Sequence, residues 1–156
     1  MKALEMTINQ YINALEKRYK SGISTEHTFR ADLQVLLETL APGVSVINEP
    51  KSYDFGRPDY IVQMQNLSIG YIEAKNIGTD LSGKDFAEQF NRYRNALNNL
   101  LFIDYLDFHF YLNGEQTNSV KIAEVINDTI RPRAAFNIIP SPMSRSPKYA
   151  EFFALK

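Results

Sequence analysis

The segment that most constrains the fold is "GRPDYIVQMQNLSIGYIEAKN", Gly56 to Asn76. Its two apolar runs are short and rich in Ile, Val and Tyr, which is typical of β-strands, and the polar stretch between them reads as a turn. Asp59 precedes the first run, and Glu73 and Lys75 interrupt the end of the second. Buried charges need partners, so these three residues require an explanation.

The predicted hairpin gives the three charges a geometry. If the turn places Met64 opposite Ser68, a constant register makes Asp59 face Glu73. Directly opposed side chains have Cβ atoms about 4.5 to 5.5 Å apart, and two like charges at that distance need compensation. Lys75 shares the face of Glu73 because side chains alternate along a strand. We therefore predict that Asp59, Glu73 and Lys75 converge on one site.

Two converging carboxylates are suited to a hard divalent cation, Mg²⁺ above all, with Mn²⁺ as a substitute. A lysine beside them could orient or deprotonate a metal-bound water, and the metal would stabilise charge that develops on a phosphate. The alternative is a solvent-facing hairpin on which Glu73 and Lys75 are ordinary polar positions, since so short a motif often matches by accident. The apolar residues around the acid and the lysine favour the buried site.

The order of elements along the chain predicts the fold class. The spacing of apolar residues indicates helices over 4–19, from Ser24 or Thr25 to 40, and over 86–101, and strands near 44–46, 60–64, 69–75 and 106–112. The segment "KIAEVIND" suggests a further short helix. This order predicts an α/β (α+β) fold with a mixed central sheet flanked by helices.

Length and composition limit the function classes. The 156 residues, 44% of them hydrophobic, suffice for one domain, 1–156, in which 131–156 reads as a linker toward a missing C-terminal region. The net charge of -1 leaves any nucleic-acid contact to local patches, and the absence of cysteine excludes thiolate metal sites. The chain has no apolar run of the length that a membrane span needs, so we expect a cytoplasmic protein.

The motifs, taken in order, resemble the PD-(D/E)xK nuclease superfamily. The segments "TEHTFRADLQVLLETL", "GRPDYIV", "IGYIEAKNIGTDL" and "QFNRYRNALNNLLFIDYLDFHFYLNGE" are similar to the N-terminal endonuclease domain of single-chain restriction-modification enzymes, which continue into an adenine-N6 methyltransferase and a target-recognition region. The resemblance implies a restriction-endonuclease-like core. It also implies Mg²⁺-dependent hydrolysis of DNA, with a methyltransferase region in the same polypeptide or complex.

The resemblance adds four residues to the site. It implies that Glu26 assists catalysis, that the backbone carbonyl of Ala74 is a metal ligand beside Asp59 and Glu73, and that Gln89 and Tyr93 form a Q-x-x-x-Y element that contacts DNA or supports the site. Glu26 could instead be a first-turn acid that complements a helix dipole. Plain core packing is the alternative for Tyr93.

Two other functions stay open at this point. A nuclease of DNA repair or recombination would share the same catalytic residues, and a non-cleaving DNA-binding module could keep the same fold. The non-cleaving module predicts loss of Asp59, Glu73 or Lys75, yet all three are present. The chain also lacks methyltransferase motifs, so we expect a nuclease domain that was cut from, or naturally separated from, a longer enzyme.

Overall fold

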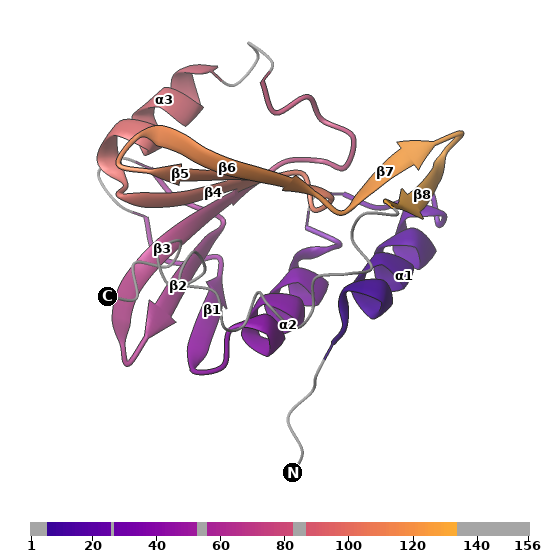
Figure 1. The fold of residues 1–156 in the computed structure, drawn as a ribbon, viewed down its shortest axis with the longest axis horizontal. Coiled ribbons are helices and arrows are strands. Elements are labelled where there is room, and N and C mark those ends of the chain that lie inside the picture. Colours follow the sequence, from indigo (N-terminus) through magenta and orange to yellow (C-terminus); the bar gives the residue numbers. More distant parts are fainter. Residues whose placement is uncertain (1–5, 26, 53–55, 83–86, 134–156) are drawn as a thin grey trace.

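The computed structural model describes residues 6–25, 27–52, 56–82 and 87–133. Its centre is a six-stranded sheet whose strands lie side by side in chain order (Figure 1). Neighbouring strands run antiparallel, except β3 and β4, which run parallel. A separate hairpin of two strands follows. The strands are β1 (Val44–Asn48), β2 (Tyr60–Met64), β3 (Leu67–Ala74), β4 (Asn99–Ile103), β5 (Asp107–Leu112), β6 (Glu115–Lys121), β7 (Ala123–Ile126) and β8 (Thr129–Pro132).

In the described part of the chain, three helices cover the sheet: α1 (Ile8–Tyr19), α2 (Arg30–Leu40) and α3 (Ala87–Ala96). Thr7 starts α1 with a capping box, in which its hydroxyl accepts from the Gln10 amide and its own amide donates to the Gln10 side chain. Helix α3 forms the crossover that parallel neighbours such as β3 and β4 require. The predicted mixed sheet flanked by helices is confirmed.

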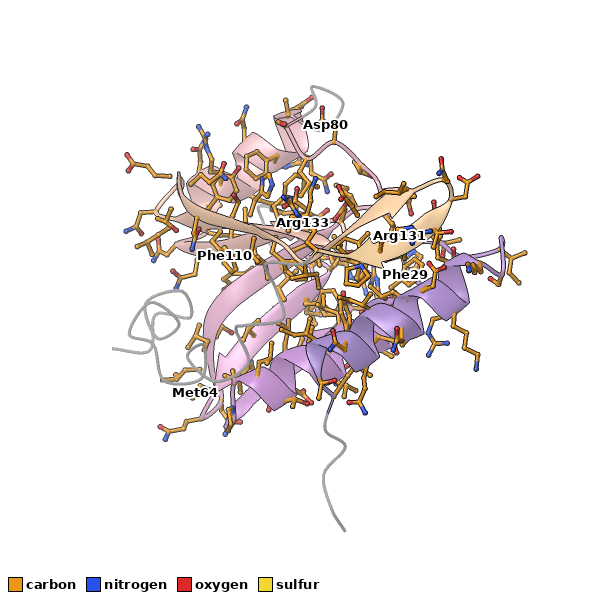
Figure 2. The ribbon with its side chains drawn as sticks, turned by 45° about the vertical axis from the view of Figure 1, so that its right-hand side comes forward. Phe29, Met64, Asp80, Phe110, Arg131 and Arg133 are labelled. Atoms are coloured by element: carbon orange, nitrogen blue, oxygen red, sulfur yellow. The ribbon has the colours of Figure 1, made fainter. Side chains whose placement is uncertain are left out.

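The helices bury two separate clusters of apolar side chains. Apolar residues of α1, α2 and one sheet face form the larger core, which Figure 2 shows as side chains filling the layer between these elements. The smaller core lies beneath α3 and consists of Tyr71, Phe90, Tyr93, Leu97, Leu100 and Tyr111. The central sheet is therefore covered by helices on both faces.

None of the described helices is both long and apolar enough to cross a membrane.

Several predicted elements are wrong in extent or type. Helix α2 begins at Arg30 rather than at Ser24 or Thr25, because residues 27–29 form a turn in which the Arg30 amide donates to the His27 carbonyl. Residues 99–101, predicted to be helical, belong to β4, whose five residues are all buried. The predicted helix in "KIAEVIND" is instead the end of β6, strand β7 and the turn into β8. Strand β6 was not predicted at all.

The register of the β2–β3 hairpin differs from the prediction near the turn and agrees with it farther away. Met64 pairs with Leu67 rather than Ser68, across a two-residue turn with positive φ angles at both positions. A bulge then leaves Ile69 without a partner in the ladder. Beyond it Tyr60 pairs with Ile72, which is the predicted register. The ladder ends there, one residue before Asp59 would face Glu73.

The segment 131–156 was predicted to be a linker. Arg131 and Pro132 lie in β8, which pairs with β7 and packs against α1. Residues 134–156 lie outside the described part of the chain, so the linker stays a prediction.

Candidate active site

At the end of β3, Glu73 and the apolar residues Ile72 and Ala74 point to opposite faces of the sheet. Ile72 and Ala74 belong to the core beneath α1 and α2, whereas Tyr71 packs into the core beneath α3. Alternation along the strand therefore places Glu73 on the α3 side, where it is only 5% exposed. Glu73 is the last residue but one of β3, whose first residue, Leu67, follows the hairpin turn. The site is therefore at the end of β3 that lies away from its hairpin turn.

Glu73, Lys75 and Gln89 form a closed ring of hydrogen bonds. The Lys75 amine donates to Glu73 Oε1 at 3.2 Å and to the Gln89 side-chain oxygen at 3.0 Å. The Gln89 side-chain nitrogen donates to the same Glu73 oxygen at 2.9 Å. An amide can serve both partners because it has a donor and an acceptor end. Gln89, from α3, therefore fixes the relative positions of the acid and the lysine.

Asp59 is joined to the same strand segment through the main chain. Its Oδ2 accepts from the Ala74 amide at 2.8 Å, and Ala74 lies between Glu73 and Lys75 in the sequence. Its Oδ1 accepts from the Arg30 guanidinium. The carboxylate is thereby held at both oxygens, and its side chain is 15% exposed. The structure thus brings Asp59 next to the strand that carries Glu73 and Lys75.

Tyr93 connects α3 to the loop that precedes Asp59. Its hydroxyl donates to the Arg57 carbonyl at 2.9 Å, and the side chain is almost completely buried. Burial raises the pKa of the Tyr93 phenol, and the negative charges of Glu73 and Asp59 raise it further. The phenol therefore remains a protonated donor. This geometry favours the supporting role for Tyr93 over direct contact with DNA.

Helix α3 contacts both the segment with Glu73 and Lys75 and the loop that precedes Asp59. Gln89 and Tyr93 are four residues apart and project from one face of the helix. Gln89 contacts Glu73 near the end of β3 and Lys75 just after it, while Tyr93 contacts the loop before Asp59. Helix α3 thus contacts both halves of the site.

Two of the predicted site features are not placed by the structure. Glu26 lies outside the described residues, so its role stays a prediction. The predicted metal contact of the Ala74 carbonyl also stays a prediction, although the Ala74 amide does bond to Asp59.

Sequence reasoning missed Arg30, which contacts Asp59 directly. A signal for it exists, because Arg30, Leu33 and Leu37 have the spacing of one helical face, and both leucines are buried. An arginine on an apolar face indicates a buried ion pair.

The donor atoms at this site fit a hard divalent cation in type. Asp59 and Glu73 are carboxylates, and Mg²⁺ typically binds one or two carboxylates and completes its shell with water and phosphate. Each carboxylate oxygen has two lone pairs, so the contacts of Asp59 leave it further acceptor capacity. Within residues 6–25, 27–52, 56–82 and 87–133, no three His, Asp or Glu side chains form a group that could hold a metal. A cation here would therefore depend on water and substrate for the rest of its ligands.

The mixed sheet flanked by helices is consistent with a restriction-endonuclease-like core, and Asp59 is bonded to the main chain of the segment that carries Glu73 and Lys75. No protein-family model matches the sequence, and no curated protein matches it either. Among solved structures, a cryo-EM structure of a DrdV–DNA complex matches 72% of this chain with a TM-score of 0.52 and 23% identity. The match spans 12% of that chain's length. At this identity the likeness shows the fold.

Proposed function

We propose that this chain is a Mg²⁺-dependent endodeoxyribonuclease domain of a restriction-modification system. The observation that carries the proposal is the joint anchoring of Asp59, Glu73 and Lys75, in which the Ala74 amide holds Asp59 and the Lys75 amine lies 3.2 Å from Glu73. The fold that the chain shares with part of a DNA-bound protein supports DNA as its substrate. A methyltransferase and target-recognition region, in the same polypeptide or in a complex, would supply sequence specificity.

Each residue has a distinct part in the proposed reaction. Asp59 and Glu73, with the Ala74 carbonyl, would hold Mg²⁺, which supplies a water of lowered pKa and offsets charge on the phosphate. Lys75 orients the attacking water through its amine. Gln89 keeps that amine beside Glu73, because it accepts from the lysine and donates to the acid. Glu26 would assist from the segment before α2.

The test compares cleavage of plasmid DNA by the wild type, Asp59→Ala and Lys75→Ala, with Mg²⁺ or with EDTA, in the longest natural polypeptide that contains this chain. We expect Lys75→Ala to bind the cation but not to cleave, and Asp59→Ala to lose both properties. Lys20→Ala is the matched control, because Lys20 pairs with Glu16 on α1 rather than with the site residues. Equal nicking by all variants would refute the assignment, and DNA binding without cleavage by the wild type would indicate a non-cleaving module.

A further inference from the structure

Arg30 is a charged residue that the fold buries almost completely. It is the first residue of α2, and its side chain is only 6% exposed. A buried guanidinium is costly unless its donors are paired. The contacts of the Arg30 guanidinium therefore indicate its structural role.

The guanidinium joins the end of β1 to the start of β2. Its Nη1 donates to Asn48 Oδ1 at 3.2 Å and to Glu49 Oε1 at 3.3 Å, while its Nη2 donates to Asp59 Oδ1. Arginine presents its donors in a rigid planar fork, so the contacts of Nη1 with Asn48 and with the exposed Glu49 side chain orient Nη2 toward Asp59. The Asp59 carboxylate is therefore held by a group that is itself held by β1.

The backbone of Arg30 is fixed as well. Its carbonyl accepts from the Tyr60 hydroxyl at 3.1 Å, and Tyr60 is fully buried and follows Asp59 directly. The guanidinium carbon lies 6.0 Å from the centre of the Tyr60 ring, which is cation–π distance. Arg30 thus contacts two successive residues, Asp59 with its side chain and Tyr60 with both its main chain and its side chain.

We propose that Arg30 is a positioning residue that fixes the Asp59 carboxylate for cation binding by Asp59 and Glu73. Arg30 holds one oxygen of this carboxylate and the Ala74 amide holds the other, so the carboxylate cannot turn away from the strand that carries Glu73. The inference rests on the proposed nuclease function. It adds a residue from α2 to a site otherwise built from the residue before β2, the end of β3 with the residue after it, and α3.

The first experiment measures the cation itself. Arg30→Lys keeps the charge but loses the fork. Groups that orient a metal ligand typically change metal affinity by 10–100-fold, so we expect at least a roughly tenfold weaker affinity for Mn²⁺, followed by electron paramagnetic resonance. Arg18→Lys is the control, because Arg18 forms a similar pair with Asp32 between α1 and α2. Wild-type affinity in Arg30→Lys would overturn the proposal.

The second experiment needs neither metal nor DNA. We compare hydrogen exchange at the Ala74 amide, which donates to Asp59, with exchange at the Lys75 amide, which donates to the Ile103 carbonyl in the sheet. Arg30→Lys should accelerate exchange at Ala74 more than at Lys75, whereas general loosening would accelerate both. An unchanged ratio overturns the role of Arg30. If the wild type binds no Mn²⁺ and cleaves no DNA, the proposed function fails, and this ratio still decides the positioning role.

A milder variant covers the case in which Arg30→Lys does not fold. Tyr60→Phe removes only the hydroxyl that holds the Arg30 carbonyl. We expect a smaller change of the Ala74 to Lys75 exchange ratio in the same direction. A folded Tyr60→Phe variant with the wild-type ratio would overturn the proposal in that case.

Discussion

Gly56→Ala tests whether the loop before Asp59 depends on contact with Tyr93. Gly56 has a φ of +128°, and a Cβ at this position would lie 3.0 Å from Tyr93 Cε1 and 3.1 Å from its hydroxyl oxygen. The same hydroxyl donates to the carbonyl of Arg57, the next residue. The substitution therefore strains the backbone and displaces the group that anchors the loop.

The cost follows from these two effects. A non-glycine residue in such a sparsely populated conformation costs about 1–3 kcal/mol. Moving the Tyr93 ring away from its rotamer adds about 0.5–1.5 kcal/mol. We expect Gly56→Ala to lower the free energy of unfolding by about 1.5–4.5 kcal/mol, which is a large part of the total of about 5–15 kcal/mol for a domain.

Urea unfolding followed by circular dichroism measures this loss. Gly22→Ala is the matched control, since Gly22 has a φ of +74° but no atom within 4 Å of an added Cβ, and we expect it to cost about 1 kcal/mol. In a Tyr93→Leu background the cost of Gly56→Ala should fall by about 1 kcal/mol, because the ring is gone. If Gly56→Ala costs no more than Gly22→Ala, the contact with Tyr93 does not constrain the loop.

Three further predictions follow from single residues. Gln89→Leu removes the contacts of the side-chain amide with Lys75 and Glu73, so DNA nicking assays should show cleavage about 10–100-fold slower. Cleavage at the wild-type rate would contradict the role of Gln89. Asp104→Ala leaves three backbone amides without their acceptor, and urea unfolding should show a free energy of unfolding lower by about 2–4 kcal/mol. The control Asp80→Ala, at an exposed position, should lower it by less than about 1 kcal/mol. Burial raises the pKa of the Tyr11 and Tyr60 phenols. The free energy of unfolding should therefore stay constant below about pH 10 with respect to these groups, and fall above it because the same phenols ionise in the unfolded chain. The fall should be about 1.4 kcal/mol per pH unit for each phenol. Tyr60→Phe should remove one such contribution from the slope of unfolding free energy against pH.

The hairpin that carries the site could be predicted because its signals are local. Alternation and turn residues identify β2 and β3. Period two predicts that Glu73 and Lys75 share one face, and their side chains are hydrogen-bonded in the structure. The register near Asp59 was predicted correctly for an incorrect reason. The actual turn is one residue shorter than assumed, and the bulge at Ile69 restores the offset. Turn length and bulge together set the register, and the pattern of apolar residues alone does not reveal either.

The strands missed by the sequence analysis carry weak or misleading signals in the sequence. All five residues of β4 are buried because both faces of the sheet are covered, so the run continues the helical spacing of α3 without a visible break. The residues of β6 are almost all exposed, and its signal is the Asn113–Gly114 turn that starts it. In "KIAEVIND", Ile122, Val125 and Ile126 have helical spacing, and this spacing concealed the β7–β8 hairpin, which turns at Asn127 and Asp128.

The sequence by itself determined the acids, the lysine and the strand that presents two of them, because adjacent residues in an extended chain have fixed relative directions. Only the tertiary structure decided which distant groups meet them. Arg30 lies 29 residues before Asp59, and Gln89 lies 14 residues after Lys75. Their contacts depend on where α2 and α3 pack against the sheet, and that packing results from the burial of whole helix faces rather than from any local motif.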